Sequence, residues 1–358
     1  MIPVTRSFLP PFEEYSAYLK EIWDSGMLTN NGPLVTTLEE KLKDFLGVRH
    51  LFFVTNGTIA LQIAIKALAL SGEVITTPFT YVATTSSLVW EGCTPVFVDI
   101  DPHTLSIDAD KIEAAITKRT SAVLTTHVYG IPCDVEKIQS IANKHGLKVI
   151  YDAAHTFGVN YLGKSLVSFG DISTLSFHAT KLFHTAEGGA IVTNDDEIAH
   201  RVRYLRNFGH KDQESFWGLG INGKNSELHA AMGLSVLPYV KRIISARRQL
   251  CALYDHLLKD TELVHPQQPV GTEHNFAYYP VLFPSEKILL RTRDRLNSHE
   301  IFPRRYFYPS LDQLPYLQST NLSNAHKAAR RILCLPLFYE LTHEEVNTIS
   351  SIIKQTMG

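Results

Sequence analysis

The chain has 358 residues, of which 44% are hydrophobic and 20% are charged, and its formal net charge at pH 7 is −2. This composition is ordinary for a globular protein with a large core, and the charge balance gives no reason to expect a nucleic-acid or membrane surface. The four cysteines have no CxxC spacing, and no run is long and apolar enough to span a bilayer. We therefore expect a cytoplasmic protein with reduced cysteines and with no nucleic-acid or membrane partner.

Most of the chain alternates between short apolar runs and segments with a helical period. Helices are predicted over residues 11–24, 34–46, 59–70, 80–91, 109–116 and 135–145. Strands are predicted over residues 51–54, 73–76, 95–99, 121–126, 148–152, 172–177 and 190–193. Strands that alternate with helices indicate an α/β fold, in which a mostly parallel central sheet is flanked by helices on both faces.

The pattern changes after Gly223. A long helical stretch is predicted from Ser226 towards Leu258, with an interruption at Pro238. It is followed by predicted strands over 274–283 and 301–308 and by predicted helices over 287–298 and 342–355. We therefore predict a large domain over residues 1–235, which includes an N-terminal arm, and a smaller C-terminal α+β domain over residues 236–358.

Ligands of such sheets bind at the carboxyl ends of the strands. The residues predicted at these ends are Asn56, Thr77, Asp99, His127 and Asp152. A carboxylate at the end of an apolar strand is placed to hold a cation, but Asp99 and Asp152 share this placement. The strand pattern alone does not choose between them.

Lys181 lies in the loop between the last two apolar runs, among small, apolar and histidine residues. Desolvation in such a loop lowers the pKa of a lysine amine, and the neutral amine can form a Schiff base with a carbonyl compound. An ordinary loop lysine is the alternative, and it remains open at this point.

Three other features accompany this lysine. Asn56-Gly57-Thr58 joins a strand to a helix, which suits a phosphate at the helix N-terminus but equally suits a plain capped turn. Ser176 could add a hydroxyl donor to the phosphate, and Tyr81 could either stack on a flat heterocycle or fill the core. A lysine, a strand-end aspartate, a phosphate cradle and a stacking ring are together what pyridoxal 5'-phosphate requires.

These residues lie in segments that resemble the DegT/DnrJ/EryC1/StrS family of sugar aminotransferases. The segments are LTNNGP (28–33), FVTNGTIAL (53–61), ITTPFTYVAT (75–84), PVFVDIDPHTLSID (95–108), HVYG (127–130), DAAH (152–155), SFHATK (176–181) and EGG (187–189). The resemblance implies the aspartate aminotransferase fold, fold type I of the pyridoxal phosphate enzymes. It also implies roles for single residues: Lys181 carries the cofactor as a Schiff base, and Asp152 holds the pyridine nitrogen. The other cofactor contacts that it implies are Tyr81 and His155 at the ring, Gly57, Thr58 and Ser176 at the phosphate, and Asn222.

The stretch GINGKNSELHAA (220–231) departs from the family's usual GYNYRMTELQAA. Asn222 is kept, but Gly223 replaces the tyrosine and Lys224 the arginine, and lysine lacks the planar fork of arginine. In the family this loop reaches the site of the partner subunit, so the resemblance implies a homodimer with shared active sites. The candidate substrate contacts are Lys224, Arg304, Arg305 and Tyr308.

The implied activity is transfer of an amino group from L-glutamate to a nucleotide-linked sugar. The overall resemblance favours enzymes that aminate a dTDP-linked 4-keto-6-deoxy sugar at C4, for surface polysaccharide such as the O-antigen of lipopolysaccharide. Amination of a 3-keto or UDP-linked sugar remains open, as does a non-catalytic regulatory protein that binds a sugar nucleotide. Lys181 argues against the dehydratases of this superfamily, which have histidine at that position.

Two further patterns carry no site. The GxGxxG match at 218–223 follows a polar stretch rather than a strand, so it does not indicate a dinucleotide site. The sixteen histidines include no HExxH motif and no Cys/His cluster, so no metal is expected.

Overall fold

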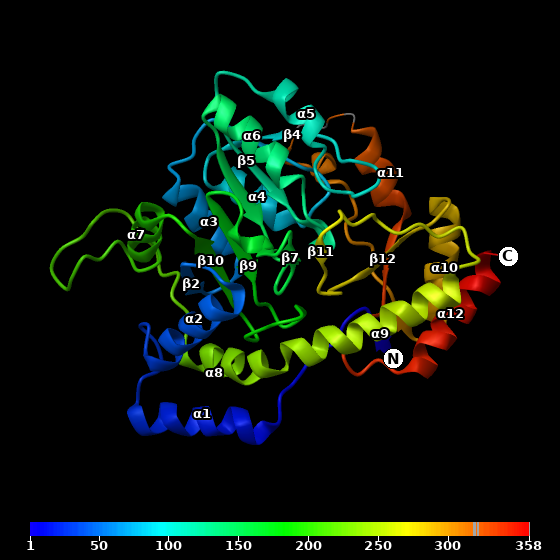
Figure 1. The fold of residues 1–358 in the computed structure, drawn as a ribbon, viewed down its shortest axis with the longest axis horizontal. Helices are drawn as coiled ribbons and strands as arrows, with labels where there is room; N and C mark the ends of the chain where they lie inside the picture. Colours follow the sequence, from blue (N-terminus) through cyan, green and yellow to red (C-terminus); the bar gives the residue numbers. More distant parts are fainter. Residues whose placement is uncertain (318–319, 321, 358) are drawn as a thin grey trace.

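A seven-stranded sheet forms the centre of the larger part of the molecule (Figure 1). The structure is a computed structural model, and it describes residues 1–317, 320 and 322–357. In spatial order the strands are β2 (His50–Val54), β10 (Gly189–Thr193), β9 (Ile172–Ser176), β6 (Lys148–Asp152), β5 (Thr120–Thr126), β3 (Glu73–Thr76) and β4 (Thr94–Phe97). Only β10 runs against its neighbours, β2 and β9, so the predicted mostly parallel sheet is confirmed.

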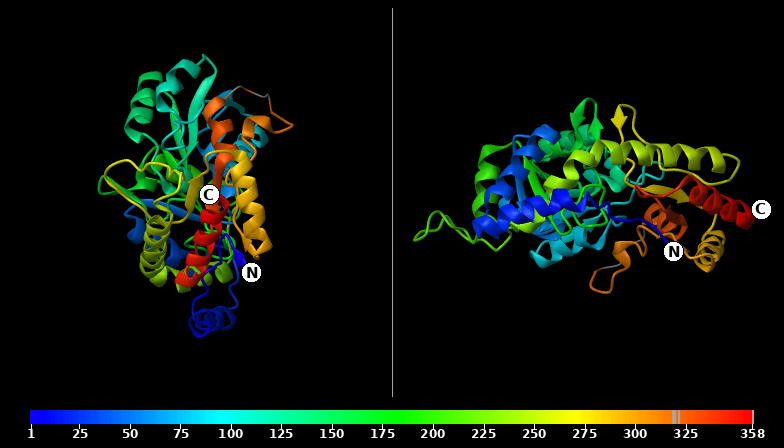
Figure 2. Two further views of the ribbon diagram at one scale, coloured as in Figure 1. Left: turned by 90° about the vertical axis from the view of Figure 1, so that its right-hand side faces the viewer. Right: turned by 90° about the horizontal axis from the view of Figure 1, so that it is seen from below.

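Helices cover both faces of this sheet (Figures 1 and 2). The helices of this part are α1 (Phe12–Ser25), α2 (Pro33–Leu46), α3 (Gly57–Ala67), α4 (Val82–Trp90), α5 (Ala109–Ile112), α6 (Val135–His145), α7 (Asp196–Leu205) and α8 (Glu227–Val236). Side chains alternate along each strand: Phe52 packs with α3 and α7, whereas Phe53 packs with α2 and α8 on the other face. This double coverage explains why the strands read as nearly continuous apolar runs.

The long helix α9 (Val240–Leu258) leads from the large part into the C-terminal part, as Figures 1 and 2 show. A short 3-10 turn at Leu237–Tyr239 separates it from α8, in agreement with the predicted interruption at Pro238. The C-terminal part contains β12 (Tyr279–Leu282) paired with β14 (Ile332–Leu335), and its helices are α10 (Glu286–Ser298), α11 (Ser323–Arg331) and α12 (His343–Met357).

Two short strand pairings join the described residues of the large part and the C-terminal part. β1 (Ile2–Pro3) pairs with β13 (Ile301–Phe302), so the first residues of the N-terminal arm join the C-terminal part. β11 (Thr272–Glu273) pairs with β7 (Asn160–Tyr161), which forms a hairpin with β8 (Lys164–Ser165). The predicted boundary places the whole N-terminal arm with the large domain and so does not include the pairing of β1 with β13.

The predicted strands over 274–283 and 301–308 were too long. Only Tyr279–Leu282 and Ile301–Phe302 are strands. The first is limited by its short partner β14, and the second is followed directly by Pro303, which cannot donate to a ladder. The chain beside them is irregular and supplies side chains to the cavity described below. The sequence pattern did not predict helices α7 and α11 or strand β14. In the described part of the chain, no helix has the length and apolar character required to cross a membrane.

Candidate active site

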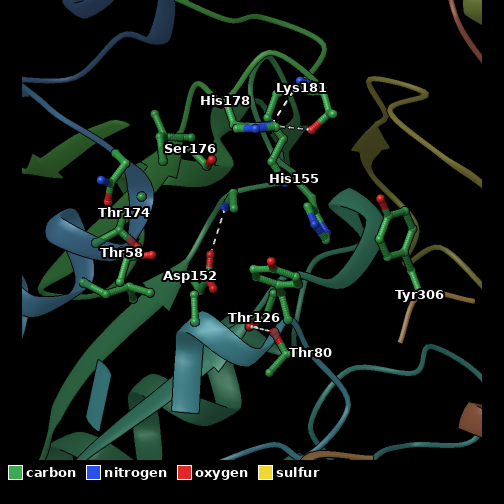
Figure 3. Close-up of a pocket in the computed structure, with 18 of the residues that line it drawn as sticks. Thr58, Thr80, Thr126, Asp152, His155, Thr174, Ser176, His178, Lys181 and Tyr306 are labelled. Atoms are coloured by element: carbon green, nitrogen blue, oxygen red, sulfur yellow. Dashed lines mark hydrogen bonds between the residues drawn. The ribbon is translucent and has the colours of Figure 1, made fainter. Parts of the chain in front are cut away.

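A cavity of about 380 Å³ lies at the carboxyl ends of the central strands. Figure 3 shows side chains from several loops converging on it, with Asp152 on one side and Lys181 on another. Eight of the predicted site residues line it: Gly57, Thr58, Tyr81, Asp152, His155, Ser176, Lys181 and Arg304. The fold therefore brings together the proposed lysine, aspartate, phosphate-binding and ring-binding groups.

Lys181 lies in the loop between β9 and β10 and is partly buried. Its backbone N–H donates to the carbonyl of His178 at 2.8 Å, and its Nζ donates to Oη of Tyr278 at 3.3 Å. Burial lowers the pKa of the Lys181 amine, and the nearby carboxylate of Asp152 opposes this change. A neutral amine is therefore more accessible here than on a solvated lysine, as nucleophilic or base chemistry requires.

Asp152 is the last residue of β6 and is only 5% exposed. Its Oδ2 accepts a hydrogen bond from the Thr84 hydroxyl at 2.6 Å, and its Oδ1 accepts one from the Ala154 N–H at 3.1 Å. Burial raises the pKa of Asp152, whereas both hydrogen bonds and the Lys181 amine act in the opposite direction. The site thus holds a buried carboxylate with specific support for its charged form.

The turn before α3 forms another wall of the cavity. Asn56 caps this helix, because its side chain accepts from the Ile59 N–H at 2.9 Å. A Cβ on Gly57 would lie 3.0 Å from Cβ of Ser176, so glycine allows the start of the helix to approach Ser176 closely. A helix N-terminus beside two hydroxyl residues, Thr58 and Ser176, is a favourable place for a phosphate.

These groups fit pyridoxal phosphate. A buried carboxylate, an amine whose pKa is lowered, and a helix N-terminus opened by a glycine lie around one cavity. Tyr81 lies at the cavity from the N-cap of α4, and His155 at the turn after β6. His155 accepts from the Tyr129 N–H at 3.0 Å, and its burial beside Lys181 lowers its pKa, so the ring is neutral.

The C-terminal part closes one side of the cavity with Tyr278, Arg304, Tyr306 and Phe307. The rings of His155 and Phe307 are parallel, with centroids 5.9 Å apart and an interplanar angle of 3°. The sequence reading missed the three aromatic residues of this set. A signal for Tyr278 existed, because strand alternation places it opposite its neighbour Tyr279, whose side chain lies in the core of the C-terminal part.

Two predicted substrate residues lie outside the lining of the cavity. The Arg305 guanidinium donates to Oε1 of Glu286 at 2.8 Å and to the carbonyl of Ala329 at 3.1 Å. The same guanidinium lies 3.6 Å from the centroid of the Tyr308 ring. Arg305 and Tyr308 therefore take part in contacts within the C-terminal part, whereas the neighbouring Arg304 reaches the cavity.

Asn222 and Lys224 also lie outside the lining of this chain's cavity, among the residues that the structure describes. Lys224 Nζ donates to Oδ1 of Asn222 at 2.9 Å and lies 4.6 Å from the centroid of the Phe208 ring. The backbone of Lys224 pairs with Val54 at the end of β2. These contacts hold Lys224, whose side chain is buried, against its own chain.

A sequence profile of the DegT/DnrJ/EryC1/StrS aminotransferase family matches residues 12–354. The chain belongs to this family. It is 46% identical over 359 residues to dTDP-4-amino-4,6-dideoxy-D-glucose transaminase of Shigella dysenteriae, and the match covers 98% of both chains. It is 42% identical over 372 residues to the Escherichia coli protein of the same name, again over 98% of both chains.

A solved relative has the same fold. The crystal structure of DesI in the presence of its TDP-sugar product matches with a TM-score of 0.94 and 34% identity, over 99% of this chain and 92% of the other. The present protein is thus an aminotransferase of a family that depends on pyridoxal phosphate. Within the described part of this aminotransferase, no group of three or more histidine, cysteine or acidic side chains is arranged to hold a metal ion.

Proposed function

We propose that this aminotransferase uses pyridoxal phosphate to transfer an amino group from L-glutamate to C4 of dTDP-4-keto-6-deoxyglucose. The product would be dTDP-4-amino-4,6-dideoxyglucose. The cavity that joins Lys181 to Asp152 supports the chemistry. The similarity to two dTDP-4-amino-4,6-dideoxy-D-glucose transaminases over nearly the whole chain supports the substrate. We also propose, from the resemblance to the family, a role in the synthesis of surface polysaccharide such as O-antigen.

In this proposal Lys181 and Asp152 act on the two ends of the cofactor's reacting system. Bound pyridoxal phosphate supplies an electron sink that acidifies the Cα proton of an amino acid. The Nζ of Lys181, whose pKa is lowered by burial, would accept and return the proton that moves during the transfer. The ionised Asp152 would hold the protonated ring nitrogen and so maintain the electron sink.

The remaining cofactor contacts follow from the walls of the cavity. Gly57, Thr58 and Ser176 are proposed to bind the phosphate at the start of α3. Tyr81 is proposed to stack on the ring, with His155 nearby. These assignments are tested by cofactor affinity, which Thr58→Val should lower about tenfold by removing one hydroxyl from a charged ligand.

Both proposed substrates are anions, and Arg304 brings a permanent positive charge to the cavity lining. Its guanidinium lies 5.0 Å from the centroid of the Tyr306 ring, another residue of the cavity lining. We therefore assign the diphosphate contact to Arg304 rather than to Arg305, which is already bound to Glu286.

The proposal includes a homodimer in which Asn222 and Lys224 of one subunit complete the site of the other. The segment 207–221 extends away from the body of the subunit in Figures 1 and 2. It carries large exposed apolar side chains, namely Phe208, Phe216, Trp217, Leu219 and Ile221. Exposed apolar groups gathered in this way mark an interaction surface.

A mixed-dimer experiment tests the shared site. One variant carries Lys181→Ala, the other carries Asn222→Ala with Lys224→Ala, and the two are mixed and re-formed as dimers. If the sites are shared, a mixed dimer has one site with both defects and one with neither, so activity recovers to at most half of the wild-type value. Mixed dimers confirmed by mass that remain inactive would reject the shared site.

The substrate is tested by supplying dTDP- and UDP-linked keto sugars with L-glutamate. We expect the highest kcat/KM for dTDP-4-keto-6-deoxyglucose and a product whose amine is on C4 by NMR. An amine on C3, or a preference for the UDP-linked sugar, would contradict the proposed substrate. An internal Schiff base gives a visible absorption band that borohydride removes. If the purified protein shows no such band, the proposed catalysis is contradicted and a regulatory protein is favoured.

A further inference from the structure

Four buried oxygen atoms form a continuous chain of hydrogen bonds beneath the cavity. The Thr84 hydroxyl donates to Oδ2 of Asp152 at 2.6 Å. The hydroxyls of Thr80 and Thr84 are 3.0 Å apart, and those of Thr80 and Thr126 are 2.7 Å apart. The three threonines and Asp152 are all buried, and Figure 3 shows the bond between Thr80 and Thr126 near Asp152.

When Asp152 is ionised, the donors and acceptors in this chain of hydrogen bonds can be arranged in only one direction. A threonine hydroxyl has a single hydrogen, and Thr84 donates its hydrogen to Asp152. Thr80 must then donate to Thr84, and Thr126 must donate to Thr80. A proton on Oδ2 of Asp152 would reverse the bond to Thr84 and leave the Thr84 hydrogen without this acceptor.

The members of this chain come from three elements that meet below the cavity. Thr126 ends β5 and is the register partner of Asp152 on β6. Thr84 lies in the first turn of α4, where its N–H donates to the carbonyl of Tyr81 at 3.1 Å. Thr80 directly precedes Tyr81. The chain thus connects the carboxylate to the loop that carries the proposed ring-stacking residue.

We propose that Thr126, Thr80 and Thr84 form a directed hydroxyl relay that keeps the buried carboxylate of Asp152 ionised and fixes its orientation. This inference rests on the proposed function, in which the ionised Asp152 holds the protonated ring nitrogen. The residue that contacts Asp152, Thr84, is not among the described residues that line the cavity, so it acts as a positioning residue through Asp152. Successive hydroxyl bonds polarise one another and so strengthen the last donor.

Helix α4 offers a matched control. Thr85, the neighbour of Thr84, is equally buried, and its Oγ1 has no hydrogen-bond partner in the described structure. Replacing either threonine by valine keeps the shape of the side chain and removes one hydroxyl. Only Thr84→Val removes a donor from Asp152, so a difference between the two variants isolates the relay from a general effect on the helix.

Two other titratable groups, Lys181 and Tyr278, interact with this carboxylate, and a third, His155, lines the same cavity. Lys181 faces it across the cavity, and burial lowers the lysine's pKa. Burial also lowers the pKa of His155 and raises that of Tyr278, so both are neutral at physiological pH. These groups and the cofactor's own ionisation are the same in every variant, so a difference between variants reports Asp152.

The first measurement is the Kd for pyridoxal phosphate in the cofactor-free dimer, as a function of pH. Thr84→Val should move the acid limb of cofactor affinity to higher pH by about one unit, because each hydrogen bond to a carboxylate lowers its pKa by about that amount. Thr84→Ser, which keeps the hydroxyl, and Thr85→Val should match the wild type. A Thr84→Val profile that matches the wild type, or a Thr85→Val profile that moves as far, would overturn the proposal.

The second measurement needs no cofactor. Burial raises the pKa of Asp152 in the folded protein, so ionising it costs stability as the pH rises from the unfolded to the folded pKa. Thr84→Val raises that pKa further, and its deficit in unfolding temperature relative to the wild type should grow with pH. The deficit of Thr85→Val should not change with pH. A constant deficit for Thr84→Val would reject the relay.

A variant at the far end of the chain separates a relay from a single hydrogen bond. Thr126→Val leaves the bond between Thr84 and Asp152 in place, and we expect a shift in the same direction as for Thr84→Val but smaller. An unshifted Thr126→Val profile would reject the relay, and this variant decides alone if Thr84→Val does not fold. Failure of the wild type to bind pyridoxal phosphate would contradict the proposed function instead, and the unfolding series would still test the relay.

Discussion

Asp152 and Asp99 lie at comparable places at the carboxyl edge of the sheet, yet their surroundings differ. Both are buried, with exposed fractions of 5% and 9%. Asp99 accepts hydrogen bonds from the backbone N–H groups of Asn324 and Ala325, at 3.0 and 2.9 Å, in the first turn of α11. Asp152 accepts from Thr84 and Ala154 and faces Lys181 across the cavity.

This difference shows that the role of a carboxylate at a strand end is decided by the segment of the chain that packs over that strand end. The C-terminal part places a helix N-terminus on Asp99, which stabilises the negative charge and holds the two parts together. Above Asp152 the same part leaves a cavity instead. We can therefore compare pairs of similar residues, one in the cavity with an expected role in catalysis and one in a packing contact with an expected role in stability.

The largest effect is expected at Lys181 in the cavity. Lys181→Ala should lower kcat by about a thousandfold or more, because it removes the group that moves the proton. Cofactor should still bind through the phosphate contacts, as dialysis followed by absorbance would show. Lys118→Ala, at an exposed position away from the cavity, serves as the control. Turnover of purified Lys181→Ala at the wild-type rate would show that the lysine was wrongly chosen.

The two aspartates should show opposite effects. Asp152→Asn should lower kcat by about a hundredfold or more with a small change in unfolding temperature, since it removes the charge that holds the protonated ring. Asp99→Asn should lower the free energy of unfolding by about 1–3 kcal/mol, because an amide replaces one acceptor of the α11 contacts. Its kcat should remain near the wild-type value. Equal kinetic losses in the two variants would remove the distinction between the two regions.

Arg304 and Arg305 extend the comparison to adjacent residues. Arg304→Ala should raise the KM for the nucleotide sugar about tenfold, because one charge-assisted contact to the diphosphate is lost. Arg305→Ala should instead lower the unfolding temperature, because Glu286 loses its partner. Steady-state kinetics and thermal unfolding on both variants make the test. A larger KM increase for Arg305→Ala would reverse the assignment.

The smallest effect is expected for Tyr278→Phe. The Tyr278 hydroxyl accepts from Lys181 Nζ and so favours the charged amine, and its loss should lower the lysine's pKa by about half to one unit. Below that pKa, cofactor-free protein should then react faster with pyridoxal phosphate at a given pH. Tyr279→Phe, which removes a hydrogen bond to Asp255 outside the cavity, should leave the pH profile unchanged. Identical profiles for wild type and Tyr278→Phe would show that this hydrogen bond does not tune the amine.

The sequence by itself was sufficient to predict the sheet and much of the cavity. Apolar runs over 73–76 and 148–152 match β3 and β6 at both ends, because strands covered on both faces leave a continuous apolar signal. Family segments around Lys181, Asp152 and Gly57 identified residues that the structure brings to one cavity. Local sequence carries this information because the residues of each segment act through one strand end or one turn.

Only the tertiary structure decided what lies above those strand ends. The contact of Asp99 with α11 joins residues 225 or more positions apart, and the separation of Arg304 from Arg305 depends on packing within the C-terminal part. The alignment of Thr126, Thr80 and Thr84 on Asp152 likewise depends on the register of β5 with β6 and on the start of α4. Such contacts have no local pattern, because they arise where surfaces from distant segments meet.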